Sequence, residues 1–295
     1  MLKRTLVFSS PMVLSLKNQQ IVIAYKDSKN ETVTVPIEDV GVVLLENQQT
    51  NITLPLLNAL AENEVQVVIC NSKGMPSAMV QGMNSNNLQG ANLRNQIVCG
   101  EVLKKQLWKQ VVGAKIRNQA SVLDCIGEEG NVLKSFYTNI RSGDADNKEG
   151  IAARIYFQHL FGDGFVRNRD EPGINALLNY GYSILRAATC RAIVSSGLFP
   201  AIGICHHNRS NAYPLADDLM EPFRPFVDRI VYDIIMRGKL ELTKDVKGEL
   251  INVLYTDTMY KKVKRPLSVG LSMTTASMAK CLSKEQITLS LPAFP

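Results

Sequence analysis

With 295 residues, of which 45% are hydrophobic and 20% charged, the chain is long enough for one large domain or two ordinary ones. No stretch approaches the roughly 20 consecutive apolar residues that span a bilayer, so we expect a cytoplasmic protein without membrane contact. The six cysteines form no CxxC pair, which argues against a zinc ribbon and against a disulfide framework. The net charge is +6, and residues 1–80 carry six basic and seven acidic side chains. The positive excess therefore lies in the later part of the chain, where a polyanion would bind.

The first eighty residues have the pattern of a compact β domain. Short segments rich in Val, Ile and Leu are separated by turn-prone residues at nearly regular spacing. We expect six strands, at residues 4–9, 12–16, 20–25, 31–37, 40–45 and 65–70. One helix is expected at residues 54–64, with Thr53 as its cap. Residues 1–80 are therefore predicted to form a small β-sandwich-like domain.

The pattern changes after a Gly-, Asn-, Ser- and Gln-rich linker at residues 81–91. Beyond it, apolar residues recur at helical spacing. We expect helices within residues 92–127, 147–162, 174–197, 215–238, 246–265 and 266–284. The sequence thus predicts an α+β protein in which the small β domain is followed by a larger, basic, all-α domain over residues 92–295.

Two of the three histidines, His206 and His207, stand directly upstream of the carboxylates Asp217, Asp218 and Glu221. The histidines are expected on a loop or a helix edge, because proline and glycine interrupt the preceding helix. Asp218 and Glu221 are three residues apart on the next predicted helix, and Asp217 and Glu221 are four apart, so either pair shares a helix face. Imidazole with carboxylate is a ligand set that suits Mg²⁺ or Mn²⁺ as well as Zn²⁺.

An open metal site usually has a third protein ligand, which the local sequence does not identify. Glu149 and His159, both within the helix predicted at residues 147–162, are the candidates. Glu149 is also explained as an acidic first-turn residue that complements the helix dipole. The pattern alone leaves two interpretations open. One is a metal site, and the other is a set of helix-start carboxylates beside ordinary loop histidines.

The helical part is rich in arginine, the side chain that binds phosphate through two parallel hydrogen bonds. Metal-binding carboxylates among arginines favour phosphoryl transfer on nucleic acid. The candidate DNA contacts are Arg154, Arg186, Arg209 and Arg224. The sequence contains no GxxxxGK[ST] loop, no GxGxxG after a strand and no GxSxG, which disfavours the mechanisms that these motifs serve.

The long segment "NALLNYGYSILRAATCRAIVSSGLFPAIGICHHNRSNAYPLADDLMEPFRPFVD" resembles the core of the CRISPR-associated spacer-acquisition endonuclease, the integrase subunit of the adaptation complex. The resemblance extends upstream through "KEGIAARIYFQHLFG". It also fits the whole chain, because this family has a small N-terminal β domain, a linker and a helical C-terminal domain. The asparagine-rich loop and "DDLMEPFRP" are most similar to the branch that accompanies a single-protein RNA-guided effector nuclease (type II).

The resemblance implies that Glu149, His206 and Glu221 are the catalytic residues and hold a divalent metal, Mg²⁺ or Mn²⁺. Asp218 matches an acidic position that some members place close to the metal. The doubled histidine leaves the register open by one residue, so His207 is the alternative to His206.

The resemblance also implies an enzyme, a metal-dependent DNA endonuclease and integrase that inserts new spacers into a CRISPR array during antiviral defence. The 3′-hydroxyl of a captured fragment would attack a phosphate at the repeat boundary. The implied partners are double-stranded DNA, a second copy of the chain and a small ferredoxin-like subunit, with the effector nuclease as a further candidate. Two alternatives stay open: a stand-alone metal-dependent nuclease on branched DNA, and a non-catalytic nucleic-acid-binding scaffold subunit.

Overall fold

The structure is a computed structural model, and it describes residues 3–26, 32–72, 74–80, 82, 86–168, 171–206 and 208–295. The chain forms two compact units, Met1–Asn87 and Leu88–Pro295. Within the described part, no helix is both long enough and apolar enough to cross a membrane.

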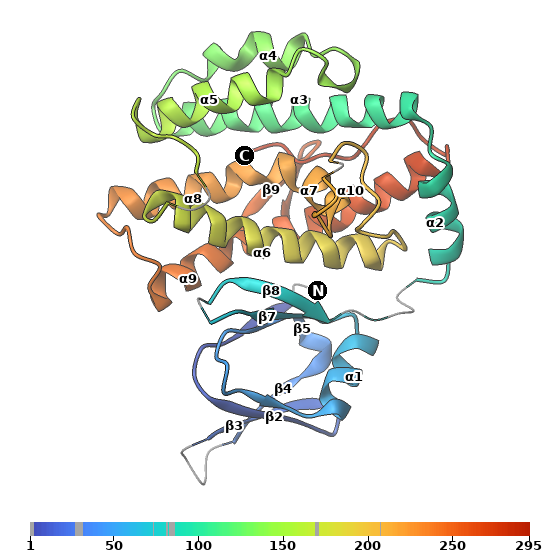
Figure 1. Cartoon of the computed structure of the whole chain (residues 1–295), viewed down its shortest axis with the longest axis vertical. Helices are drawn as coiled ribbons and strands as arrows, with labels where there is room; N and C mark the ends of the chain where they lie inside the picture. Colours follow the sequence, from blue (N-terminus) through green and yellow to red (C-terminus); the bar gives the residue numbers. More distant parts are fainter. Residues whose placement is uncertain are drawn as a thin grey trace. The chain divides into compact units, whose positions relative to one another are not determined.

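Two four-stranded sheets make up most of the described first unit (Figure 1). One sheet has the order β1-β5-β7-β8 and the other the order β4-β3-β2-β6. The first sheet is parallel except for β8, which pairs antiparallel with β7. The strands are β1 (Arg4–Phe8), β2 (Met12–Lys17), β3 (Gln20–Tyr25), β4 (Thr32–Pro36), β5 (Val40–Leu45), β6 (Asn51–Ile52), β7 (Gln66–Cys70) and β8 (Pro76–Val80), with a short 3₁₀ helix η1 (Ile37–Asp39).

Both sheets and the helix α1 (Leu54–Glu62) contribute side chains to one hydrophobic core, including Leu14, Val43 and Leu60. The six predicted strands and the predicted helix are present. Thr53 takes the N-cap position of α1 but makes no side-chain cap bond. The sequence did not predict β6 or β8. The more detailed prediction, that the two sheets pack against each other as a sandwich, stays a prediction.

Helix α3 (Glu101–Cys125) is the longest element of the second unit and lies between two groups of helices (Figure 1). Its contacts are with α4 and α5 on one side and with α7 and α8 on the other. The remaining helices are α2 (Gln89–Val98), α4 (Lys134–Thr138), α5 (Lys148–Phe161), α6 (Ile174–Ser195), α7 (Pro214–Met220), α8 (Arg224–Met236), α9 (Lys244–Ile251) and α10 (Leu267–Leu282). Four 3₁₀ helices join them, η2 (Gly130–Leu133), η3 (Ser142–Asp144), η4 (Glu221–Phe223) and η5 (Asn252–Tyr255).

Two of the predicted helices are interrupted. The helical run at residues 92–127 breaks at Gly100, which caps α3 with an extended backbone, so α2 and α3 are separate helices. The run at residues 215–238 is divided into α7, η4 and α8. Pro222 and Pro225 explain this division, because neither can donate the N–H bond that a continuous α-helix requires.

The prediction of an all-α second domain is wrong in one place. Residues 257–266, which were predicted as part of a helix, form an antiparallel hairpin of β9 (Asp257–Tyr260) and β10 (Val263–Pro266). Lys261 in the turn has a positive φ of 56°, which ends any helix there. The overall description, sheets in the N-terminal part and a mainly helical C-terminal part, holds.

Candidate active site

Glu149 lies in the first turn of α5, next to an unusual helix start. The N-cap residue Asn147 has a left-handed backbone (φ 50°) and makes no side-chain cap bond. The carboxylate of Asp144 instead accepts hydrogen bonds from the backbone N–H groups of Lys148 (2.9 Å) and Glu149 (3.0 Å). Since Asp144 satisfies these donors, the side chain of Glu149 is not used as a cap and pairs with Lys115.

Glu221 lies at the joint between α7 and α8, and only 3% of its side chain is exposed. Its Oε1 pairs with Arg224 at 2.9 Å, and its Oε2 lies 2.5 Å from the ammonium of Lys115. This second contact is a close ion pair with a buried ammonium. Burial alone would raise the pKa of Glu221, but the positive charges of Arg224 and Lys115 outweigh it and hold the pKa below its usual value.

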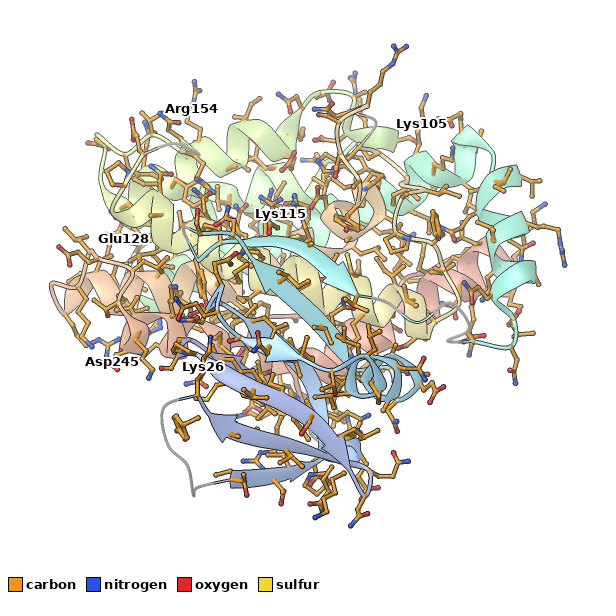
Figure 2. All side chains as sticks on the ribbon, turned by 60° about the horizontal axis from the view of Figure 1, so that its bottom comes forward. Lys26, Lys105, Lys115, Glu128, Arg154 and Asp245 are labelled. Atoms are coloured by element: carbon orange, nitrogen blue, oxygen red, sulfur yellow. The ribbon has the colours of Figure 1, made fainter. Side chains whose placement is uncertain are left out.

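Lys115 joins the two glutamates. It extends from the middle of α3, is only 7% exposed, and contacts the carboxylates of both Glu149 and Glu221. Burial would lower the pKa of its ammonium, but the two carboxylates outweigh burial and raise the pKa above its usual value. Figure 2 labels Lys115 within the helical unit, whereas the labelled Arg154 and Lys105 lie at its outer edge. A buried lysine paired with two carboxylates therefore lies at the centre of the site.

His206 lies on the loop between α6 and α7, and Asp218 of α7 holds this loop. The buried carboxylate of Asp218 accepts from the backbone N–H groups of Ile204 (2.6 Å), Cys205 (3.1 Å) and His206 (3.1 Å). It also contacts Nδ1 of the His206 ring at 2.6 Å. This hydrogen bond raises the pKa of His206 and makes Nδ1 the protonated nitrogen of the neutral ring, which leaves Nε2 as the nitrogen that can bind a cation.

Three neighbouring residues define the surroundings of His206. A Cβ on Gly203 would lie 2.8 Å from Oδ2 of Asp218, so glycine allows the loop backbone to approach the carboxylate. The ring of Trp108 on α3 meets the imidazole edge-on, with the ring centroids 5.6 Å apart. Burial, together with the charge of Asp218, raises the pKa of Cys205 to about 12, so its thiol is neutral in the metal-free protein.

The donor set fits a divalent cation. Two carboxylates and an imidazole are ligands that Mg²⁺ or Mn²⁺ accepts. A metal-ligating histidine typically donates its other ring N–H to a carboxylate, as His206 does to Asp218. The described residues contain no group of three His, Cys, Asp or Glu side chains already gathered to hold a metal, and Lys115 lies between the two glutamates.

His159 and the neighbouring aspartate, Asp217, lie elsewhere. His159 contacts Glu128 at 3.1 Å and does not join the glutamates of the site. His207 lies outside the described residues. Asp217 accepts two hydrogen bonds from Arg186, of 2.6 and 2.9 Å. Asp217 is therefore the partner of an arginine in this structure.

The four predicted DNA-binding arginines fall into two groups. Arg154 on α5 and Arg209 in the loop before α7 are exposed. Arg186 is bound to a carboxylate, and Arg224 both pairs with Glu221 and lies over an aromatic ring. The second group therefore positions carboxylates in this structure, and DNA contact by any of the four stays a prediction.

Residues 5–267 match the family model described as CRISPR associated protein Cas1. The chain belongs to the Cas1 family. It is 40% identical over 256 residues to the CRISPR-associated endonuclease Cas1 of Neisseria meningitidis serogroup C (strain 8013), an alignment that covers 85% of this chain and 83% of that protein. The resemblance to the CRISPR endonuclease and integrase family that the sequence indicated is thereby confirmed.

Solved structures share the Cas1 fold over nearly the whole chain. A casposase bound to its integration product has a TM-score of 0.78 at 22% identity and covers 98% of this chain and 93% of that chain. A Cas6-RT-Cas1--Cas2 complex has a TM-score of 0.74 at 21% identity and covers 98% of this chain and 36% of that chain.

A pocket of about 410 Å³ opens beside the glutamate and lysine of this Cas1-family site. Glu149, Lys115 and Gln119 line it, together with Arg154 and Phe157. Arginine and aromatic side chains are the contacts that single-stranded nucleic acids use, through their phosphates and bases. The pocket therefore brings an arginine and an aromatic side chain close to the carboxylate of Glu149.

The sequence did not predict that Lys115, Asp144 and Trp108 contact the candidate site residues. The one signal for Lys115 is its place inside the apolar run "VVGAKI" of a helix that is buried on most sides. A lysine in such a run must be paired, because an unpaired buried charge is too costly. Asp144 lies between the helices predicted at residues 92–127 and 147–162.

Proposed function

We propose that this chain is a divalent-metal-dependent DNA integrase, which inserts new spacers into a CRISPR array by attack of a DNA 3′-hydroxyl on repeat-boundary phosphates. One observation carries the proposal: Glu149 and Glu221 meet around a buried positive charge, and His206 nearby is oriented through Asp218. Glu149, His206 and Glu221 would hold Mg²⁺ or Mn²⁺. When bound there, such an ion supplies Lewis-acid stabilisation of the negative charge on the phosphate oxygens.

The remaining residues of the site hold or orient its reacting groups. Arg224 fixes one oxygen of Glu221, and Asn118 donates a 2.7 Å hydrogen bond to the carbonyl of Pro222, which anchors the same turn to α3. Asp218 fixes the orientation of His206. These contacts keep the ligands in place before DNA arrives, so that little reorganisation is needed during the reaction.

The reaction exchanges one phosphodiester bond for another. The incoming 3′-oxygen forms a bond to the phosphorus as the bond between that phosphorus and the host 3′-oxygen breaks, and the proton lost by the attacking hydroxyl is balanced by the proton that the released host hydroxyl takes up. DNA supplies the nucleophile, so the protein needs none of its own. The exposed Arg154 and Arg209 would bind DNA phosphates, with an affinity that falls steeply as salt rises.

We propose that the active assembly contains two copies of the chain and a small ferredoxin-like partner, and that it acts on double-stranded DNA in the cytoplasm. Two insertions at the two ends of one repeat require two active sites at a fixed separation. The Cas6-RT-Cas1--Cas2 complex, which shares the fold, supports a partner of the Cas2 kind. In this proposal the β unit supplies the dimer and partner contacts, and the effector nuclease is a further candidate partner.

The test is strand transfer of a labelled 3′-hydroxyl DNA fragment into a supercoiled plasmid that carries a CRISPR repeat, with Mn²⁺ and the small partner present. Wild type should yield covalently labelled plasmid, and a fragment with a blocked 3′ end should yield none. Glu149→Ala should abolish labelling and leave DNA binding intact. Glu129→Ala, which changes an exposed glutamate, is the matched control and should behave as wild type.

Two outcomes would overturn the proposal. If wild type nicks branched DNA but never joins the fragment, the chain is a stand-alone nuclease. If it only binds DNA, and Glu149→Ala binds equally well, the chain is a scaffold subunit and the carboxylate cluster is structural.

A further inference from the structure

The two glutamates of the proposed metal site are already neutralised by cations of the chain itself. Lys115 contacts both Glu149 and Glu221, and Arg224 pairs with Glu221 alone. These four side chains carry two positive and two negative charges, so their sum is zero. A divalent ion that entered between the glutamates would meet the ammonium of Lys115 at close range and would be repelled by it.

Lys115 is the cation that can leave. Arg224 is held on both sides, because it pairs with Glu221 and its guanidinium lies 4.8 Å from the ring centre of Tyr182. Lys115 contacts two carboxylates and Arg224 one, so what distinguishes Lys115 is its flexible four-carbon stem, which lets the ammonium move while α3 stays in place.

A receiving group lies one helical turn away from Lys115. Gln119 follows it by four residues on α3, so the two side chains share a face of the helix. Gln119 is only 1% exposed, and its Oε1 has no hydrogen-bond partner within the described part of the chain. An unpaired buried acceptor is costly, so a donor that reaches it is stabilised there.

The space for this movement is present. Lys115 and Gln119 both line the pocket of about 410 Å³ beside Glu149, and the carboxylate of Asp228 lines it as well. The ammonium can therefore turn away from the glutamates into a region that offers the amide oxygen of Gln119.

We propose that Lys115 is an internal competitor of the divalent cation: it occupies the space between Glu149 and Glu221 in the metal-free protein and turns toward Gln119 when the cation binds. This inference rests on the proposed function, because it concerns the same site. Lys115 keeps the two carboxylates from repelling each other while metal is absent, and it sets the metal concentration that the site requires.

The experiment is calorimetric titration of MnCl₂ into the full chain after removal of metal. Wild type should bind saturably, and Glu149→Ala should not. Lys115→Met should bind Mn²⁺ about 10- to 100-fold more tightly, since one or two charge-assisted hydrogen bonds no longer have to be broken. Lys109→Met, which changes an exposed lysine on the same helix, is the control and should match wild type.

Two further variants test the movement itself. Gln119→Leu removes the receiving oxygen and should weaken Mn²⁺ binding about 3- to 10-fold. Lys115→Arg should weaken binding as well, because a guanidinium can hold carboxylates bidentately and is harder to displace. Lys115→Arg also keeps the charge balance, so it provides the test if Lys115→Met does not fold without metal.

A second measurement is the melting temperature with and without Mn²⁺. Metal-free Lys115→Met should melt below wild type, because its two glutamates lack their shared cation, and Mn²⁺ should raise its melting temperature more than that of wild type.

The inference and the proposed function fail in different ways. If wild type binds Mn²⁺ and Glu149→Ala does not, but Lys115→Met binds no more tightly than wild type, the metal site stands and Lys115 is not a competitor. The same holds if Lys115→Met loses strand transfer at saturating Mn²⁺ with unchanged affinity, since Lys115 would then be a DNA contact. If wild type shows no saturable Mn²⁺ binding, both are overturned.

Discussion

Replacing Asp218 by asparagine should detach the loop that carries His206. The carboxylate of Asp218 accepts from three consecutive backbone N–H groups and from Nδ1 of His206, at distances between 2.6 and 3.1 Å. Asparagine has one acceptor oxygen, so two of these four donors would face an NH₂ group instead. Hydrogen bonds to a charged group contribute about 1.5–3 kcal/mol each, so the loop should lose about 3–6 kcal/mol of its attachment.

The larger effect of this substitution should be on metal binding and strand transfer, and the smaller one on global stability. The loop can separate from α7 without unfolding the helices, so the free energy of global unfolding should fall by less than the full local cost. Once His206 loses its orienting carboxylate, Mn²⁺ affinity and strand transfer should each fall about 10- to 100-fold. Urea unfolding followed by circular dichroism, Mn²⁺ titration and the plasmid assay measure the three quantities.

The control for this change is Asp233→Asn on α8. Asp233 is 48% exposed and pairs with Arg229 at 3.2 Å, and such a surface pair contributes about 1 kcal/mol or less. Asp233→Asn should therefore leave metal binding and strand transfer unchanged. If Asp218→Asn also retains the stability, metal affinity and transfer rate of wild type, the view that Asp218 positions His206 is refuted.

Three further changes test other parts of the site. Gly203→Ala would place a Cβ 2.8 Å from the carboxylate of Asp218, and we expect a loss of about 1–3 kcal/mol in unfolding free energy together with reduced strand transfer. Asn118→Ala removes the donor to the buried carbonyl of Pro222 and should cost about 2–4 kcal/mol in urea unfolding, because several buried backbone groups lose their partners. Burial raises the pKa of Asp228 to about 7 in the folded protein, whereas an aspartate in the unfolded chain has a pKa of about 3.9. The folded state therefore holds this proton more tightly, and stability is lost as the pH rises from about 4 to about 7. Wild type should lose about 3 kcal/mol between pH 5 and pH 8, and Asp228→Asn should not show this loss when both are unfolded in urea.

The local pattern of the sequence predicted most of the strands and helices. Strands β1 to β5 and β7 are runs of β-branched residues bounded by turn residues, and this information lies within each segment. The hairpin of β9 and β10 was missed because each strand has four residues and the apolar residues around it also fit a helical spacing. Its turn depends on the positive φ of Lys261, and lysine gives no signal for such a conformation.

The candidate site was predicted in part because half of it is local. Asp218 and Glu221 stand three residues apart and twelve to fifteen residues after His206, so their proximity could be judged from spacing. Lys115 lies 34 residues before Glu149 and joins the site only through the packing of α3 against α5 and η4. Pairing over such distances along the chain depends on tertiary structure, which no local pattern contains.

The charged groups of the site differ in how firmly they are held, and this difference connects stability with chemistry. Asp218 binds the His206 loop through four contacts, and Arg224 is fixed by Glu221 and by the ring of Tyr182. Such rigid contacts orient the metal ligands, but they do not provide a place where a divalent cation could be added. Lys115 borders an open pocket and has a flexible stem, so the positive charge that stabilises the metal-free site is also one that can move. A site with fixed ligands and one movable positive side chain can stay folded without metal. It can also bind a cation without any rearrangement of the ligands themselves.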